Sequence, residues 1–204
     1  MSTVTFLQIF FVCLLGAMSP GPSMVVVINN AIFKNRYHGI LTSVGHGIGI
    51  SIYALFAVLS VGLIIKTNLF FFNILQFLSV LFLIYLGIKS LISKSEINFN
   101  AESSNGGAKS FFQGFSISIL NPKIFIWFIA IYSQFMSENN DILFNIYLVF
   151  TAGIVDAIWY CLLSFIVTSN FAINRLKNKS EILQKIVGIV FITIGLLLLL
   201  ELFI

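Results

Sequence analysis

Lys123 and Asp156 are the two ionisable side chains, histidine apart, that fall near the middle of long apolar segments in this 204-residue chain. Placing either charge at the centre of a membrane helix costs about 2.5–3.5 kcal/mol on insertion scales, so each needs compensation. Two opposite charges at similar depth could meet as a structural ion pair. They could also bind the two charged groups of a substrate, and Asp156 could carry a coupling proton. None of this requires covalent chemistry, so we expect a protein that is not an enzyme.

Two proline motifs interrupt apolar segments in a matching way: SPGPS at 19–23 and NPK at 121–123. Proline kinks or ends a helix but is tolerated as the first residue of a new one, and Ser19 and Asn121 are good N-caps. A lone proline kink can be only a packing device. Two matched breaks instead indicate half-helices whose positive ends point at a transporter binding site. The candidate substrate-binding residues are Pro20, Gly21, Pro22, Asn121, Pro122, Lys123 and Asp156, and Asp156 is also the candidate for proton coupling.

The remaining titratable residues give weaker signals. His46, in GHGIG, is expected in the first turns of its segment, close to the cytoplasmic face. Histidine suits proton movement, but an incidental interfacial position is the simpler expectation, and its role stays open. Cys13 and Cys161 lie in apolar stretches without CxxC spacing, as buried thiols do. We expect no metal and no cofactor.

The chain as a whole has a membrane composition. It is 59% hydrophobic and 9% charged, whereas soluble proteins are about 25% charged. Crossing a hydrocarbon core about 30 Å thick takes about 20 apolar residues as a helix, and the apolar segments do not alternate as barrel strands would. The sequence therefore predicts an all-α integral membrane protein with six transmembrane helices. The predicted spans are 5–33, 39–65, 69–92, 111–136, 142–168 and 185–204.

Basic residues predict the orientation. Nine Lys and Arg residues fall in the first, third and fifth connections, against only Lys66 in the second and none in the fourth. The positive-inside rule then places the odd-numbered connections in the cytoplasm and both termini outside. We expect a multi-pass protein of the bacterial cytoplasmic (inner) membrane. The net charge of +4 reports topology rather than nucleic-acid binding, because the basic residues are dispersed among short loops.

A polar segment at 93–110 divides the chain into two groups of three spans. We interpret it as a flexible cytoplasmic linker between a first repeat, 1–92, and a second repeat, 111–204. With three helices in each half, the second half must cross the membrane in the inverted sense. The expected fold is thus two inverted three-helix repeats with broken first helices. Small faces for close helix packing are expected at Gly45, Gly47, Gly49, Gly188 and Gly195.

With these residues in view, the chain resembles the LysE/RhtB family of amino-acid exporters. MSPGPSMVVVINNAI is similar to the PGP signature of the family's first helix, and FLIYLGIKSL to its YLG motif. FFQGFSISILNPKIFIWFIAIYSQF is similar to the family's QGF, NPK and QF pattern, and GIVDAIWY to its Asp/Trp pattern. PGP or NPK alone is a weak signal, but the motifs occur in order and at matching spacing over essentially the whole chain.

The resemblance implies export of amino acids or close derivatives, driven by an ion gradient. It implies functional positions at both breaks and at Asp156. Many members carry an acidic residue directly after PGP, whereas this chain has Ser23 there. Asp156 is then the best remaining proton carrier, with H⁺ favoured over Na⁺ as the coupling ion. The residues suggest that the half-helix ends and Lys123 hold the substrate carboxylate and that Asp156 holds its ammonium group.

Two other functions stay open at this point, as does export of another small solute. One is a thiol–disulfide electron conduit, which would need a reactive cysteine pair beside the breaks. The other is a membrane protein without transport activity, such as an assembly factor, whose prolines are only kinks. The sequence does not tell which amino acid is carried or whether the protein forms a homo-oligomer.

Overall fold

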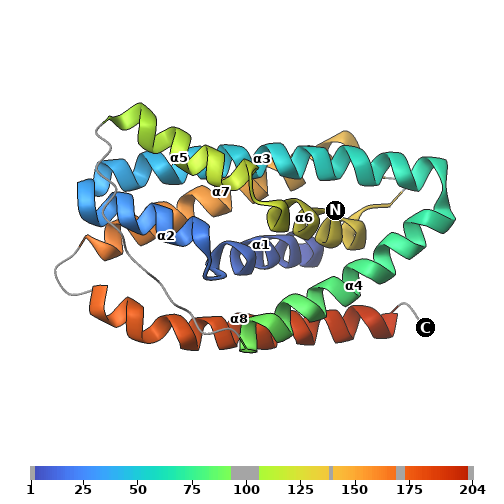
Figure 1. The fold of residues 1–204 in the computed structure, drawn as a ribbon. Coiled ribbons are helices and arrows are strands. Elements are labelled where there is room, and N and C mark those ends of the chain that lie inside the picture. Colours follow the sequence, from blue (N-terminus) through green and yellow to red (C-terminus); the bar gives the residue numbers. More distant parts are fainter. Residues whose placement is uncertain (1–2, 93–105, 138–139, 169–172, 202–204) are drawn as a thin grey trace.

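The computed structural model of this protein describes residues 3–92, 106–137, 140–168 and 173–201, and every regular element in them is a helix (Figure 1). The predicted all-helical class is therefore confirmed for the described part of the chain. The helices form an elongated bundle in which α5 lies beside α3 and α4 beside α8 (Figure 1). Their bounds are α1 Thr3–Met18, α2 Pro22–Asn29, the π-helix η1 Asn30–Lys34, α3 Arg36–Thr67, α4 Leu69–Ile92, α5 Gly107–Ile119, α6 Pro122–Phe135, α7 Ile142–Val167 and α8 Ile173–Glu201.

Both predicted helix breaks are present as sharp bends. The axis turns by 68° between α1 and the α2–η1 segment, and by 59° between α5 and α6. Pro22 is the first residue of α2 and Pro122 is the first residue of α6. Proline lacks a backbone N–H, but the first residue of a helix has no helical acceptor for its N–H, so proline costs little there. The proline positions in the sequence were therefore sufficient to locate both breaks.

The cap predicted at Asn121 is confirmed, whereas the one predicted at Ser19 is wrong. The Asn121 side chain accepts a hydrogen bond from the Lys123 N–H at 3.1 Å. The residue before α2 is instead Gly21, in extended conformation and without a side chain to cap the helix. Ser19 donates its own N–H to the Gly16 carbonyl at 3.2 Å. The difference arises because Pro22, not Pro20, takes the first helical position, which moves the cap two residues along the chain.

Helix length and composition support a multi-pass membrane protein. Within the described residues, α3, α4 and α7 are long and apolar enough to cross a membrane, and each bent pair could add one span, giving up to five. The end of α8 contributes the shorter apolar stretch Gln184–Leu200. Large apolar side chains face outward along the long helices, including Leu59 and Leu63 on α3 and Ile158 on α7. Such outward apolar faces suit a lipid environment.

Glycines set the spacing of the central helices. α3 packs against α5 on one side and α7 on the other. A Cβ added at Gly45 would lie 2.1 Å from the Phe111 carbonyl oxygen of α5, and one added at Gly47 would lie 2.7 Å from the Gly153 carbonyl oxygen of α7. Helices in membranes associate through such small residues, because close backbone approach increases van der Waals contact. The glycines of GHGIG thus form two packing faces on one helix, which agrees with the small faces expected from the sequence.

The cations of the first connection lie at one end of the bundle. Arg36 Nε donates to Thr168 Oγ1 at 2.8 Å, which joins the start of α3 to the end of α7. Lys34 Nζ donates to Ser110 Oγ at 3.4 Å, which joins η1 to the first turn of α5. The start of α5 therefore lies at this same end. α5 begins at Gly107, inside the segment predicted as linker, while 93–105 lies outside the described residues.

Candidate functional site

The two helix breaks enclose one cavity. Its volume is about 100 Å³, and its walls come from α1, the α1–α2 break, α3, the α5–α6 break, α6, α7 and α8. Six of the seven predicted substrate-binding residues line it, and Pro122 begins α6 with its side chain outside what the structure describes. The structure thus brings together residues that are more than 130 positions apart in the sequence. The polar lining residues are Ser19, Ser23, His46, Asn121, Lys123, Asp156 and Tyr160.

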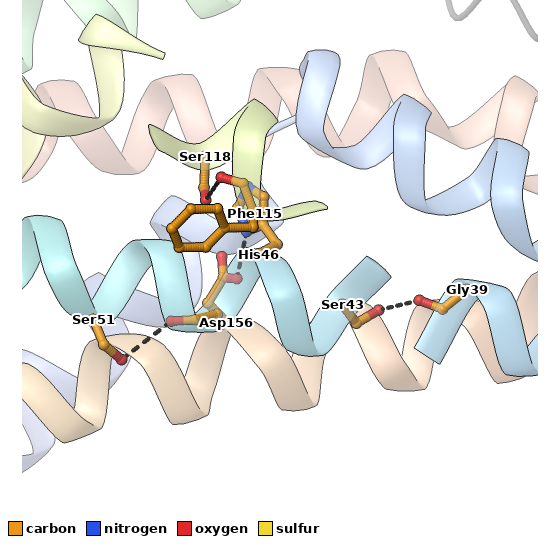
Figure 2. Close-up of polar contacts among 8 residues, drawn as sticks. Gly39, Ser43, His46, Ser51, Phe115, Ser118 and Asp156 are labelled. Carbon is orange, nitrogen blue, oxygen red and sulfur yellow. Dashed lines mark hydrogen bonds and ion pairs between the residues drawn. The ribbon is translucent and has the colours of Figure 1, made fainter. Parts of the chain in front are cut away.

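Asp156 pairs with His46, not with Lys123. Asp156 Oδ2 lies 2.6 Å from His46 Nδ1, and the two residues are 5% and 2% exposed (Figure 2). Among the described residues, no ion pair joins Asp156 to Lys123. The expectation that the two midmembrane charges meet is therefore corrected, although both line the cavity. The expectation that His46 is incidental at the interface is also wrong, because it is buried at the contact between α3 and α7.

Close approach of α3 and α7 explains this pair. Gly47 follows His46 directly, and a Cβ added there would also lie 2.7 Å from the Ala157 Cβ, one residue after Asp156. The small residues let the two backbones approach, so the side chains of His46 on α3 and Asp156 on α7 come within hydrogen-bond distance. An ionised carboxylate only accepts hydrogen bonds, so Nδ1 carries the hydrogen when Asp156 is charged. The available sequence signal was that His46 lies between two glycines, which indicates close packing of its helix but does not identify the partner.

Lys123 provides the cation of the cavity. It is the second residue of α6, and its exposed side chain lines the cavity. In the described part of the chain, its ammonium group forms no hydrogen bond or ion pair. The starts of α2 and α6 lie at the same cavity, and the first N–H groups of a helix carry a partial positive charge. This side of the cavity is therefore suited to an anionic group.

Apolar side chains make up the other walls. Ile50 of α3, Trp127 and Phe128 of α6, and Phe191 of α8 line the cavity. The Trp127 ring lies over Gly16 of α1, where an added Cβ would be 2.8 Å from the ring atom Cζ2. A cavity of about 150 Å³ holds a benzene molecule. The 100 Å³ found here is smaller, so a whole amino acid with a bulky side chain needs a wider conformation of the site.

A second group of polar side chains joins η1 to α3 and α5. Asn30 Nδ2 donates to Thr42 Oγ1 at 2.9 Å and to Gln113 Oε1 at 3.1 Å. Gln113 Oε1 also accepts from Lys34 Nζ at 3.3 Å. The π-helix η1 carries Asn30 and Lys34, and π-turns within helices are frequent at functional sites. We call Asn30, Lys34, Thr42 and Gln113 the polar cluster.

The polar cluster was not foreseen from the sequence. It connects η1 to both α3 and α5, and therefore connects the segment after the first break to the segment before the second. The available signals were Asn30 within a long apolar run and Gln113 within QGF. Neither signal indicates a partner, because the two residues are 83 positions apart.

Comparison with known proteins gives a consistent result. A sequence model of the LysE type translocator family matches residues 14–202. An uncharacterized membrane protein of Bacillus subtilis, YrhP, is 28% identical over 192 residues, covering 87% of this chain and 90% of that protein. The leucine efflux protein of Salmonella typhimurium is 25% identical over 182 residues, covering 85% of this chain and 84% of that protein. No solved structure matches the chain.

Proposed function

Since the chain belongs to the LysE type translocator family, we propose that it exports an amino acid with an apolar side chain, in exchange for protons. The family is one of transporters and not of enzymes, and a relative is named a leucine efflux protein. The observation that carries the proposal is the cavity at the two breaks, which combines a cationic side, an anionic pair and an apolar wall. A zwitterion with an apolar side chain needs these three surroundings.

The proposed binding mode follows from the positions of the charges. The substrate carboxylate binds at the starts of α2 and α6 and forms an ion pair with the Lys123 ammonium group. The substrate ammonium lies against Asp156, and the apolar side chain lies toward Ile50 and Phe128. Because the present cavity is smaller than such a substrate, binding accompanies a widening of the site.

Asp156 is the proposed proton-coupling residue. Among the described residues it is the only carboxylate that lines the cavity. The position directly after the PGP motif is Ser23, which also lines the cavity but cannot take up a proton at its hydroxyl near neutral pH. The buried pair of Asp156 and His46 either binds the substrate ammonium or takes up one proton, and antiport requires these two alternatives.

Alternating access is proposed to arise from two inverted repeats, α1–α4 and α5–α8. The packing supports this assignment: the broken helix of each half packs on the second helix of the other half, as α1 does on α7 and α5 on α3. The second helices α3 and α7 pack together, and so do the third helices α4 and α8. In this proposal the polar cluster closes the cavity toward the cytoplasm, and the hydrogen bonds of the cluster break when the cavity opens on that side.

The proposed orientation places the end with Lys34 and Arg36 in the cytoplasm and both termini outside the bacterial inner membrane. The support is the positive-inside rule together with the bonds that bring these cations to one end of the bundle.

Replacing Asp156 by Asn tests the function. Purified protein is reconstituted into lipid vesicles, and L-leucine transport against its gradient is driven by a pH gradient. We expect wild-type protein to accumulate leucine and D156N to lose this coupled transport, since Asn keeps the shape of Asp but lacks the negative charge that holds the proton or the substrate ammonium in the site. Asp141→Asn is the matched control, because Asp141 caps α7 and Asn is an equally good cap. Undiminished coupled transport by D156N would remove Asp156 from the mechanism.

A further inference from the structure

We infer that the substrate ammonium and the coupling proton compete for one atom, Nε2 of His46. This inference rests on the proposed function. The other ring nitrogen is already used, since Nδ1 lies 2.6 Å from Asp156 Oδ2 (Figure 2). With the carboxylate ionised, Nδ1 carries the hydrogen, and a neutral ring then presents a lone pair at Nε2. The carboxylate therefore sets the tautomer of the histidine.

Nε2 has no partner of its own. His46 is 2% exposed and lines the cavity, yet Nε2 forms no hydrogen bond with any described residue. Buried polar atoms without a partner are rare, and the desolvation they suffer is not compensated. A hydrogen on Nε2 would likewise be a buried donor without an acceptor in this conformation. Because His46 lines the cavity, a group that enters when the site widens can supply the partner that Nε2 lacks.

The charges around His46 select the ammonium group as this partner. The other titratable groups that line the cavity are Cys13 on α1, Lys123 on α6, and Asp156 and Tyr160 on α7. The described parts of α2, α5 and α8 contribute no titratable group to the lining. With neutral His46, the charges of Lys123 and Asp156 balance. A zwitterion bound with its carboxylate toward Lys123 then brings its ammonium, a donor of three hydrogen bonds, toward the Nε2 lone pair and the Asp156 carboxylate.

Protonation of Nε2 reverses this preference. The new N–H bond turns the acceptor into a donor and gives the ring a positive charge, so the substrate ammonium is repelled. The site thus holds either the ammonium or one additional proton. When the site faces the outside, the amino acid leaves and a proton from the outside water binds Nε2. When the site faces the cytoplasm, this N–H bond breaks, the proton passes to the cytoplasmic water, and the next amino acid binds. Each cycle moves one net positive charge inward, so the membrane potential as well as the pH gradient drives export.

The chain provides a matched control for this inference, because it has only two histidines. His38 lies outside the cavity, with Nδ1 2.8 Å from Ser110 Oγ. We compare wild-type protein, H46Q and H38Q in lipid vesicles with L-leucine as the probe. Glutamine at 46 can still donate to Asp156 and accept from an ammonium group, but it takes up no proton near neutral pH. We expect H46Q to lose at least tenfold more of the uptake driven by a pH gradient or a potential than of leucine–leucine exchange. H38Q keeps both activities.

A second measurement on the unaltered protein covers the case in which H46Q does not fold. With ¹⁵N-labelled histidine, only two imidazole rings give signals in NMR spectra, and H38Q assigns them. If proton and substrate exclude each other, tenfold excess of leucine over its dissociation constant makes protonation of His46 require about tenfold more acid. The His38 signal serves as the internal control and does not move with leucine.

The outcomes separate the inference from the proposed function. A loss of coupled uptake in H46Q that exceeds its loss of exchange at least tenfold, or a leucine-dependent titration of His46 alone, supports the inference. Full coupling in H46Q, or a His46 titration that ignores bound leucine, overturns it and leaves amino-acid export intact. Wild-type protein that neither binds nor exchanges leucine or any related apolar amino acid overturns the proposed function, and the inference with it.

Discussion

Substitution of Gly45 by Ala tests whether the α3–α5 contact positions the site. An alanine Cβ at this position would lie 2.1 Å from the Phe111 carbonyl oxygen and 2.9 Å from its carbon. Both atoms belong to the backbone of α5, so no side-chain rotation relieves the overlap, and the two helices must separate by roughly 1 Å. Overpacking of this kind costs about 1–3 kcal/mol. Alanine gains about 1 kcal/mol over glycine in helix propensity, so we expect a net loss of about 1 kcal/mol.

The same displacement reaches the functional site. His46 is the next residue after Gly45, and its bond to Asp156 has little tolerance at 2.6 Å. Separation of α3 from α5 therefore moves the imidazole relative to the carboxylate. A misplacement of about 1 Å can reduce function by about 100-fold. We expect G45A to lose most of its coupled leucine transport as well as stability.

Gly62, on the same helix, is the matched control. A Cβ added there would lie 3.4 Å from the Met136 Cε, the flexible end of a side chain, which is an ordinary contact. G62A therefore gains helix propensity without overlap and should be as stable as the wild type, or more stable by up to about 1 kcal/mol. The two Gly→Ala substitutions on α3 are thus expected to have opposite or clearly different effects.

Thermal unfolding of the purified proteins in one detergent measures this difference. For a chain of this size, 1 kcal/mol corresponds to about 2–4 °C in Tm, so G45A should unfold about 2–4 °C below the wild type. G62A should unfold at the wild-type temperature or slightly above it. If G45A unfolds at the same temperature as G62A, the tight contact between α3 and α5 does not exist in solution, and the explanation of how His46 is positioned is wrong.

Three further predictions concern the breaks and the polar side chains. Gln113→Ala removes an acceptor that Asn30 and Lys34 share, so the cytoplasmic side should open more often and Cys13 in the cavity wall should react faster with a small thiol reagent; measured in a C161S background, an unchanged rate would contradict this closure. Asn121→Ala removes the cap of α6 and should lower stability by about 0.5–2 kcal/mol in thermal unfolding, whereas N121D should not; equal stability of all three proteins would show that the cap is dispensable. Replacing Cys13 and Cys161 together by Ser should leave leucine transport within about twofold of wild type, because a hydroxyl replaces each thiol with little change in size; loss of activity would favour the thiol–disulfide conduit instead.

Local features were predicted well from the sequence. The breaks at Pro22 and Pro122 follow from proline chemistry, which acts within one helical turn and needs no knowledge of distant residues. Asn121 was identified as a cap for the same reason. Ser19 was not a cap, since two prolines compete for the first position of α2 and the sequence does not tell which one takes it.

The contacts between distant segments were predicted less well. Lys123 and Asp156 were expected to meet because both lie near the middle of their apolar segments. Depth along a helix, however, fixes only one coordinate of a side chain. Which face of the helix it occupies, and which neighbour that face meets, depends on how the helices pack. Asp156 therefore meets His46, which the sequence analysis left without a role.

The sequence by itself determined the membrane class, the helical segments, the two breaks and, through ordered motifs along the chain, the family. These properties depend on composition and on interactions within a few residues. Only the tertiary structure decided that the breaks share one cavity, that His46 and not Lys123 is the partner of Asp156, and that Asn30 and Gln113 join the segments beside the two breaks. The physical reason is that glycines at Gly45 and Gly47 let α3 approach α5 and α7 at backbone distance. That approach fixes the rotation of α3, and with it the side chains that face the site.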